Sequence, residues 1–253
     1  MPLFRNLSKV FLLAMAPLCM AAAPFTVDSL GAEKLVVVTS ADWNTDHGQM
    51  STFTLGDNGW ERASESVDVM LGRSGLGWGI GLHPQNSGED PVKKEGDGRA
   101  PAGVFSLGAA FGYLPKLAVD YPYTPMNENH FCIDVPASPL YNTTVDASEV
   151  GKDAVEGSTE PMRRDIHLKG DQRYKKGIFV NHNPKNISGA GSCIFMHLWK
   201  EQGTATAGCT AMEESAMDQL LAWLEAPEKV LYVALPQDKY QQLQQEWNLP
   251  ALQ

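Results

Sequence analysis

The chain has 253 residues, of which 43% are hydrophobic, enough for a substantial core in one large domain or two small ones. Twenty Lys and Arg stand against 30 Asp and Glu, so the formal net charge is −10. This acidity disfavours a nucleic-acid partner, because phosphate backbones are bound by clustered Lys and Arg.

Residues 1–22 predict a signal peptide. Arg5 and Lys9 form a basic start, residues 10–20 are apolar, and the alanines at 21–23 suit a cleavage site. The apolar run is shorter than the roughly 20 residues that span a bilayer, and no later segment is apolar enough to do so. We therefore expect a bacterial protein that is exported to the periplasm or secreted, with no membrane span after cleavage.

Short antiparallel strands are predicted between residues 34 and 82. Segments such as KLVVVTS and STFTLGD have strand composition, and turn signals such as Gly-Asp-Asn-Gly separate them. In the following GRSGLGWGIGLHP, alternate residues are glycine, so a strand there has one bare face. Either a substrate passes over that face or neighbouring groups pack tightly on it, and the second interpretation is preferred.

The rest of the chain alternates irregular structure with a few regular elements. Residues 113–165 are dense in Pro, Asn, Asp and Tyr and predict a long irregular segment, of the kind that often forms a binding loop or lid. KKGIFVNHN and SCIFMHLW predict strands, residues 213–226 a helix, and KVLYVALP a last strand. One mainly β domain over residues 33–236 is the economical interpretation, with residues 237–253 forming a C-terminal helix or tail.

Three cysteines follow the predicted cleavage site, namely Cys132, Cys193 and Cys209. In an oxidising compartment an odd count leaves one thiol free or paired with another chain. If Cys132 and Cys193 form a disulfide, Cys209 is the free thiol, although sequence alone gives no geometry for that pairing. Neither C-x-x-C nor H-E-x-x-H spacing occurs, so we expect no metal site.

Cys209, in TATAGCTAM, lies twelve residues after His197, in IFMHLW. An unperturbed thiol is only a few per cent ionised at neutral pH, so a nucleophilic cysteine needs a base. Gly203 and Gly208 allow the intervening loop to return the thiol to the imidazole. The alternative is a buried structural thiol and a histidine satisfied within the core, and on spacing alone this alternative is preferred.

The run SCIFMHLW…TATAGCTAM resembles the motif of the L,D-transpeptidase catalytic domain (YkuD-like) family: a histidine on a strand, a variable loop, then [ST]-x-G-C. GDGRAPAGVFSLG, WGIGLH, FCIDVPAS and FVNHN are similar to further elements of the family, in the same order. The resemblance covers residues 34–235. It implies a mainly β fold, an L,D-transpeptidase-like β-sandwich of mixed sheets with a few helices in a single domain.

The same resemblance implies roles for four residues. Cys209 is the expected nucleophile, His197 the general base, Thr206 the residue that orients the imidazole, and Gly208 with Cys209 the oxyanion donors. The implied reaction begins with attack on a peptidoglycan stem tetrapeptide, at the bond from the L-centre of a diamino acid to the terminal D-alanine. D-alanine leaves, and the acyl group passes to an amine or to water without metal, ATP or other cofactor.

The sequence departs from the family beside the nucleophile. Many members carry His or Arg where this chain has Ala207 and Ala211, which leaves the recognition of stem carboxylates open. A replacement is offered by MRRDIHLKGDQRYKK, so Arg163 and Arg164 are candidate substrate-binding residues, although a solvated loop explains this basic segment equally well. His182, in FVNHN, is a further candidate for the cleft.

Alternatives to a transpeptidase are an L,D-carboxypeptidase and a non-catalytic cell-wall binding protein on the same fold. A papain-like hydrolase is disfavoured, because those enzymes usually place the cysteine before the histidine, whereas His197 precedes Cys209 here.

Overall fold

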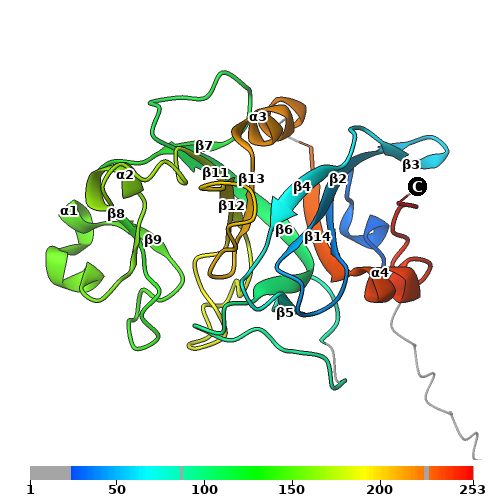
Figure 1. Cartoon of the computed structure of the whole chain (residues 1–253), viewed down its shortest axis with the longest axis horizontal. Coiled ribbons are helices and arrows are strands. Elements are labelled where there is room, and N and C mark those ends of the chain that lie inside the picture. The colour runs from blue at the N-terminus through cyan, green and yellow to red at the C-terminus, as the bar shows by residue number, and fades with distance from the viewer. Residues whose placement is uncertain (1–23, 86–87, 225–227, 253) are drawn as a thin grey trace, which may run out of the picture.

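The computed structural model describes residues 24–85, 88–224 and 228–252, and its main sheet has eleven strands (Figure 1). Eight of them form a closed, barrel-like ring in the order β1-β14-β6-β11-β12-β13-β4-β2, because β2 also pairs with β1. The strands of this sheet are β1 (Lys34–Ser40), β2 (His47–Gly56), β3 (Gly59–Arg62), β4 (Val67–Met70), β5 (Leu76–Trp78), β6 (Ala100–Gly112), β7 (Tyr123–Pro125), β11 (Lys176–Val180), β12 (Phe195–Leu198), β13 (Thr210–Met212) and β14 (Val230–Pro236).

The core of the ring lies around β1 and β14, whose apolar runs are nearly continuous. Every residue of β14 is buried, as expected for a strand covered on both faces. β1 pairs with it in parallel over seven residue pairs, from Lys34 opposite Val230 to Ser40 opposite Pro236. On the other side of the ring, β13 and β4 share a single registered pair, Ala211 opposite Met70. A bridge between Gly72 and Thr206 continues this seam beyond the strand ends, so the ring is joined over a longer register at β1–β14 than at the β13–β4 seam.

Few helices accompany the sheet, and they are short. They are α1 (Ala147–Val150), α2 (Arg164–His167), α3 (Glu214–Trp223) and α4 (Gln237–Leu243), with 3₁₀ turns η1 (Asp28–Leu30) and η2 (Lys152–Val155). α3 contacts β11 and β12 and buries one face, comprising Ala216, Met217, Leu220 and Leu221. Within the described ranges, no helix is long and apolar enough to cross a membrane.

The predicted mainly β single domain, with mixed sheets and a few helices, is confirmed. The predicted signal peptide lies outside the described residues. The predicted C-terminal helix or tail begins with α4 and continues as a segment packed on the domain, in which Trp247 and Leu249 are buried. The boundaries of the predicted domain at residues 33 and 236 remain predictions.

Tight packing explains the glycine-rich stretch. A Cβ at Gly81 would lie 2.3 Å from the carbonyl oxygen of Val104, and one at Gly79 would lie 2.8 Å from Nδ1 of His182. Both distances are far below van der Waals contact, so neighbouring backbone and side chains occupy the space beside these residues. The structure therefore agrees with the preferred interpretation of this bare face.

The segment predicted to be irregular contains a small separate sheet, which we call the cap, residues 126–171. Its strands are β8 (His130–Cys132), β9 (Thr144–Asp146) and β10 (Glu160–Pro161), in the order β10-β8-β9. With α1, η2 and α2 it lies beside the β12–β13 part of the ring, at the left of Figure 1. Strands of two or three residues are too short to show a hydrophobic period, which is why the sequence did not reveal them.

Candidate active site

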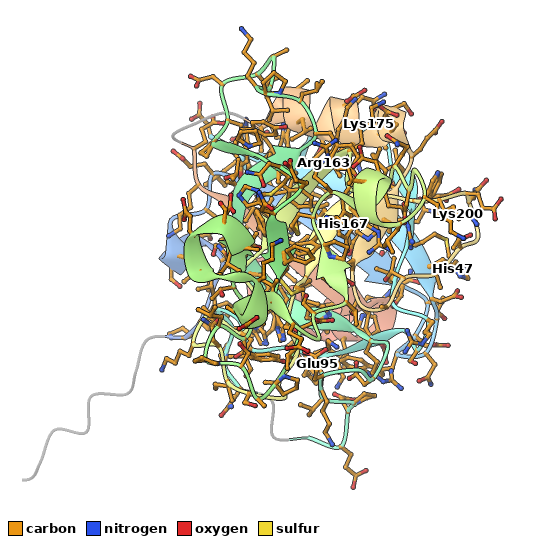
Figure 2. The ribbon with its side chains drawn as sticks, turned by 90° about the vertical axis from the view of Figure 1, so that its left-hand side faces the viewer. His47, Glu95, Arg163, His167, Lys175 and Lys200 are labelled. Atoms are coloured by element: carbon orange, nitrogen blue, oxygen red, sulfur yellow. A yellow bond between two sulfur atoms is a disulfide. The ribbon has the colours of Figure 1, made fainter. Side chains whose placement is uncertain are left out.

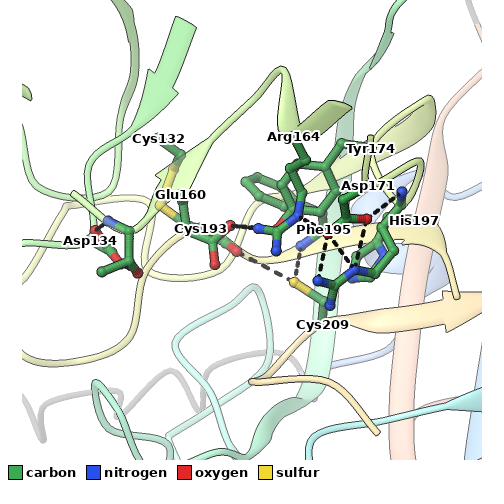
Figure 3. Close-up of polar contacts among 12 residues, drawn as sticks. Cys132, Asp134, Glu160, Arg164, Asp171, Tyr174, Cys193, Phe195, His197 and Cys209 are labelled. Atoms are coloured by element: carbon green, nitrogen blue, oxygen red, sulfur yellow. Dashed lines mark hydrogen bonds and ion pairs between the residues drawn. A yellow bond between two sulfur atoms is a disulfide. The ribbon is translucent and has the colours of Figure 1, made fainter. Parts of the chain in front are cut away.

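His197 lies on β12, and Cys209 immediately precedes the neighbouring parallel strand β13. His197 of β12 lies opposite Ala211 of β13, and Met196 opposite Thr210, so one step back places Cys209 opposite Phe195. Because side chains alternate along a strand, the thiol and the imidazole share one face of the sheet. The backbone amide of Phe195 donates a hydrogen bond to Sγ of Cys209 at 3.3 Å, and Figure 3 shows both side chains at this site.

The protonation of His197 follows from its hydrogen bond. Its Nδ1 lies 2.7 Å from the carbonyl oxygen of Leu198, and a carbonyl oxygen only accepts, so Nδ1 carries the proton. In the neutral imidazole Nε2 then holds a lone pair. Burial lowers the pKa of His197 to about 4, and the nearby guanidinium groups of Arg173 and Arg164 act in the same direction. The imidazole is therefore neutral, and competent as a base, at neutral pH.

The Cys209 thiol is also neutral at rest. Its side chain belongs to an apolar cluster, the residue is only 7% exposed, and burial raises the pKa of the thiol to about 12. The charge of Glu160 acts in the same direction, whereas the Phe195 amide and the cations Lys93 and Arg164 oppose it. The resting pair is thus thiol and neutral imidazole, so a proton must leave sulfur as sulfur attacks.

These states predict how activity depends on pH. If His197 is the general base, kcat/KM should be flat from about pH 5 to 8 and fall about tenfold per pH unit below about pH 4, as the imidazole becomes protonated. The measurement is a pH profile of D-alanine release, with intrinsic fluorescence at each pH to show that the protein stays folded. An acidic limb near pH 6.5, the usual range of histidine, would contradict this assignment.

Thr206 has a different role from the one predicted. Its hydroxyl donates to the carbonyl oxygen of Cys209 at 2.7 Å and accepts from the Gly208 amide at 3.1 Å, while its own carbonyl accepts from the Arg73 amide. Thr206 therefore stabilises the conformation of the loop before the nucleophile. The imidazole is oriented instead by the carbonyl oxygen of Leu198.

Gly208 is required for packing in the same loop. A Cβ there would lie 2.9 Å from the carbonyl oxygen of Arg99, and the backbone has a positive φ of 158°. Because the Gly208 amide already donates to Thr206, it is not free to hold an oxyanion in this state. The predicted oxyanion role of Gly208 thus does not fit the resting structure, and the sequence motif could not reveal this competing hydrogen bond.

The candidate substrate-binding arginines are charge-paired. Arg163 forms a two-pronged ion pair with Asp165 and lies over the ring of Tyr113. Arg164 bonds to Glu160 at 3.3 Å and to Asp171 at 2.9 Å. These carboxylates neutralise the guanidinium groups, so the structure does not support a free basic patch for anionic stems. The sequence indicated one because it does not show that Asp165 and Asp171 of the same segment, and Glu160 just before it, fold against these two arginines.

The two arginines differ in position. Arg163 lies on the cap face seen in Figure 2, with His167 beside it and Lys175 and Lys200 toward the rim. Arg164 instead points inward, over the ring of Tyr174, and is close enough for its charge to lower the pKa of Cys209. Arg164 is therefore a neighbour of the thiol, whereas Arg163 belongs to the cap surface.

His182 is a structural residue rather than a free polar group of a cleft. Its Nδ1 accepts from the Ile80 amide at 3.2 Å, its Nε2 donates to the Ala190 carbonyl at 2.9 Å, and burial lowers its pKa to about 4. It does border a pocket of about 410 Å³. That pocket is lined largely by uncharged residues, among them Ser106, Asn142, Asn181, Asn186 and Phe195.

A disulfide ties the cap to the strand that carries His197. Cys132, the last residue of β8, is bonded to Cys193, which lies two residues before β12, and their Cα atoms are 5.9 Å apart. Cys209 is a free, buried thiol. The carbonyl oxygen of Cys193 lies 3.5 Å from Sγ of Cys209, so the bridge meets the chain right beside the candidate nucleophile.

Removing this disulfide should destabilise the protein. The bridge spans 61 residues, for which loop-closure entropy gives about 4 kcal/mol. The variant Cys132→Ser/Cys193→Ser should melt roughly 10 °C lower than the wild type in differential scanning calorimetry. A reductant should lower the wild-type Tm and leave that of the variant unchanged. A wild-type Tm that is indifferent to reductant would contradict the disulfide.

Sequence reasoning missed two residues of the site, Glu160 and Tyr174. The Tyr174 hydroxyl donates to Oε2 of Glu160 at 2.6 Å, and its ring lies 5.2 Å from that of His197. Neither belongs to a recognisable motif, so no sequence signal pointed to them. Within the described part of the chain, no group of three or more His, Cys, Asp or Glu side chains could hold a metal ion.

No family model and no curated protein matches this chain. Among solved structures it is similar to Bd1075 of Bdellovibrio bacteriovorus, at 10% identity and a TM-score of 0.40, over 88% of this chain and 57% of that one. It is also similar to the helical cell shape determining protein Pgp2 of Campylobacter jejuni, at 12% identity and a TM-score of 0.36, over 80% and 48%. The chain thus spans about half the length of these proteins, and so distant a likeness assigns no activity.

Proposed function

We propose that this chain is an exported cysteine L,D-transpeptidase that acts on peptidoglycan stem peptides. The observation that carries the proposal is the placement of His197 on β12 and of Cys209 just before the adjacent parallel strand β13, toward one face of the sheet, with Nδ1 of the imidazole bound and Nε2 left as the base. The [ST]-x-G-C motif and its order after a strand histidine support the same chemistry. The disulfide fits an oxidising compartment outside the cytoplasm.

In the proposed reaction, Nε2 of His197 takes the thiol proton as Sγ of Cys209 attacks the carbonyl carbon before the terminal D-alanine. The C–N bond breaks, the imidazolium returns its proton to the leaving amine, and a thioester remains on Cys209. An amine of a second stem, or water, then attacks the thioester and releases the thiol. Transfer to an amine is transpeptidation, and transfer to water is L,D-carboxypeptidase activity.

One observation favours a second candidate, a cell-wall binding protein without turnover. Cys209 is deeply buried and its pKa is raised, as in an inert structural thiol. The two candidates differ in whether a covalent acyl adduct forms on this residue.

The deciding experiment uses the mature protein with purified disaccharide tetrapeptide, with and without an acceptor stem. Intact-mass spectrometry should show an acyl adduct that is absent from Cys209→Ala, and chromatography should show released D-alanine. A cross-linked dimer identifies a transpeptidase and free tripeptide a carboxypeptidase. Absence of both adduct and product would leave the binding protein as the better account.

A further inference from the structure

Three successive links place the carboxylate of Glu160 beside the candidate nucleophile. Glu160 of β10 pairs with Cys132 of β8, Cys132 is bonded to Cys193, and the Cys193 carbonyl oxygen lies 3.5 Å from Sγ of Cys209. The close-up shows Glu160 with Arg164 and Tyr174 around this thiol (Figure 3). In keeping with this placement, the negative charge of Glu160 raises the pKa of the Cys209 thiol.

The carboxylate is fixed in place but not fully enclosed. Tyr174 and Arg164 both donate to Oε2, at 2.6 and 3.3 Å, and no hydrogen bond to Oε1 is seen among the described residues. The side chain keeps 20% of its surface exposed. Burial raises the pKa of Glu160, against the opposing effect of Tyr174 and Arg164, so this carboxylate accepts a proton more readily than an exposed one.

Two other carboxylates of this region are already paired with cations. Asp171 accepts from both Arg164 and Arg173, and Asp97 pairs with the buried ammonium of Lys93. Oε1 of Glu160, by contrast, accepts no hydrogen bond from the described residues and can receive a further cationic donor.

We propose that Glu160 binds the ammonium group of the acyl acceptor and takes its proton, which makes this cap residue a determinant of transfer to an amine rather than to water. The inference rests on the proposed function, because it concerns the fate of the thioester on Cys209. It assigns the acceptor chemistry to a side chain of the cap, whereas the thiol and imidazole belong to the ring.

The proton balance of this step is as follows. The acceptor ammonium gives one proton to Glu160 and becomes a free amine, whose nitrogen attacks the thioester carbon. A C–N bond forms and the C–S bond breaks. The second proton of the nitrogen passes through His197 to the departing sulfur, which restores the Cys209 thiol, and Glu160 later releases its proton to solvent.

The test compares the wild type, Glu160→Gln and the matched control Glu214→Gln. Glu214 is the first residue of α3 and forms ion pairs with Lys175 and Lys176. Each is given tetrapeptide donor and an amine-bearing stem, and the ratio of cross-linked to hydrolysed product is measured by mass spectrometry. We expect Glu160→Gln to lower this ratio by at least about tenfold and the control to stay within about twofold of wild type. An unchanged ratio in Glu160→Gln would overturn the inference.

Hydroxylamine distinguishes loss of the Glu160 carboxylate from general damage to the active site in Glu160→Gln. It is a neutral nucleophile at pH 7, so it needs no carboxylate to bind it. Hydroxamate formed per acyl-enzyme should be equal in Glu160→Gln and wild type, and a loss as large as that of cross-linking would refute the proposal. If Glu160→Gln does not fold, a trimethylammonium analogue of the acceptor should inhibit wild-type cross-linking but not hydrolysis, and lack of inhibition overturns the idea. Absence of any acyl-enzyme in the wild type would defeat the proposed function itself, and this inference with it.

Discussion

Cys209→Ala should abolish acyl transfer and leave the protein folded. The sulfur is the atom to which the acyl group is bonded in the proposed reaction, and the other two cysteines described are joined in a disulfide. Removing a covalent nucleophile typically costs a factor of about a thousand or more in turnover. The measurement is D-alanine release from the tetrapeptide, together with the intact mass of the protein.

Thermal melting provides the control for this variant. Alanine fits the space of Cys209 and loses two weak hydrogen bonds of Sγ, the one accepted from the Phe195 amide and the one donated to the Cys193 carbonyl oxygen, so we expect a stability change of about 1 kcal/mol. A carbapenem, which acts as an alternative acyl donor in the family that the sequence resembles, should add its mass to the wild type and not to Cys209→Ala. Turnover at the wild-type rate in the variant would refute the mechanism.

His197→Ala should lower kcat/KM by at least about a hundredfold, the lower range for loss of a general base. The thiol pKa of about 12 makes the effect large, because almost no thiolate forms without a proton acceptor. Added imidazole should restore part of the activity by occupying the vacated space and accepting the proton. The measurement is steady-state D-alanine release at pH 7 with and without imidazole.

The matched control is His83→Gln, because His83 is likewise buried with its pKa lowered by burial but packs against Trp78, Phe105 and Trp247. It should lower the Tm with little change in kcat/KM, and its activity should not respond to imidazole. A loss of activity equal to that of His197→Ala would point to general destabilisation instead of catalysis.

Local patterns predicted the elements whose signals lie within one segment. KLVVVTS corresponds to β1 and KVLYVALP to β14, and the helix predicted over residues 213–226 is α3, Glu214–Trp223. Closure of the ring could not be predicted, because the pairings of β1 with β14 and of β13 with β4 join strands far apart in the sequence and depend on the twist and packing of the whole sheet.

In the candidate site, too, features encoded within one segment were predicted and long-range contacts were not. The sequence indicated Cys209 and His197 because the motif holds both within a strand and its following loop. It misjudged Arg163 and Arg164, because a run of basic residues does not reveal which carboxylates fold against it. Glu160 was missed for a related reason: the disulfide and the β8–β10 pairing bring it to the thiol from a distant part of the chain.

The weak β13–β4 seam has a mechanical consequence for the nucleophile. One registered pair joins these strands, and a bridge between Gly72 and Thr206 continues the seam, whereas seven pairs join β1 to β14, so we expect this seam to open more readily than β1–β14. Regions that must admit a ligand are drawn from the least stable parts of a structure. The shorter seam thus lies on the side of the ring where the proposed reaction needs room for an acyl chain beside the thiol.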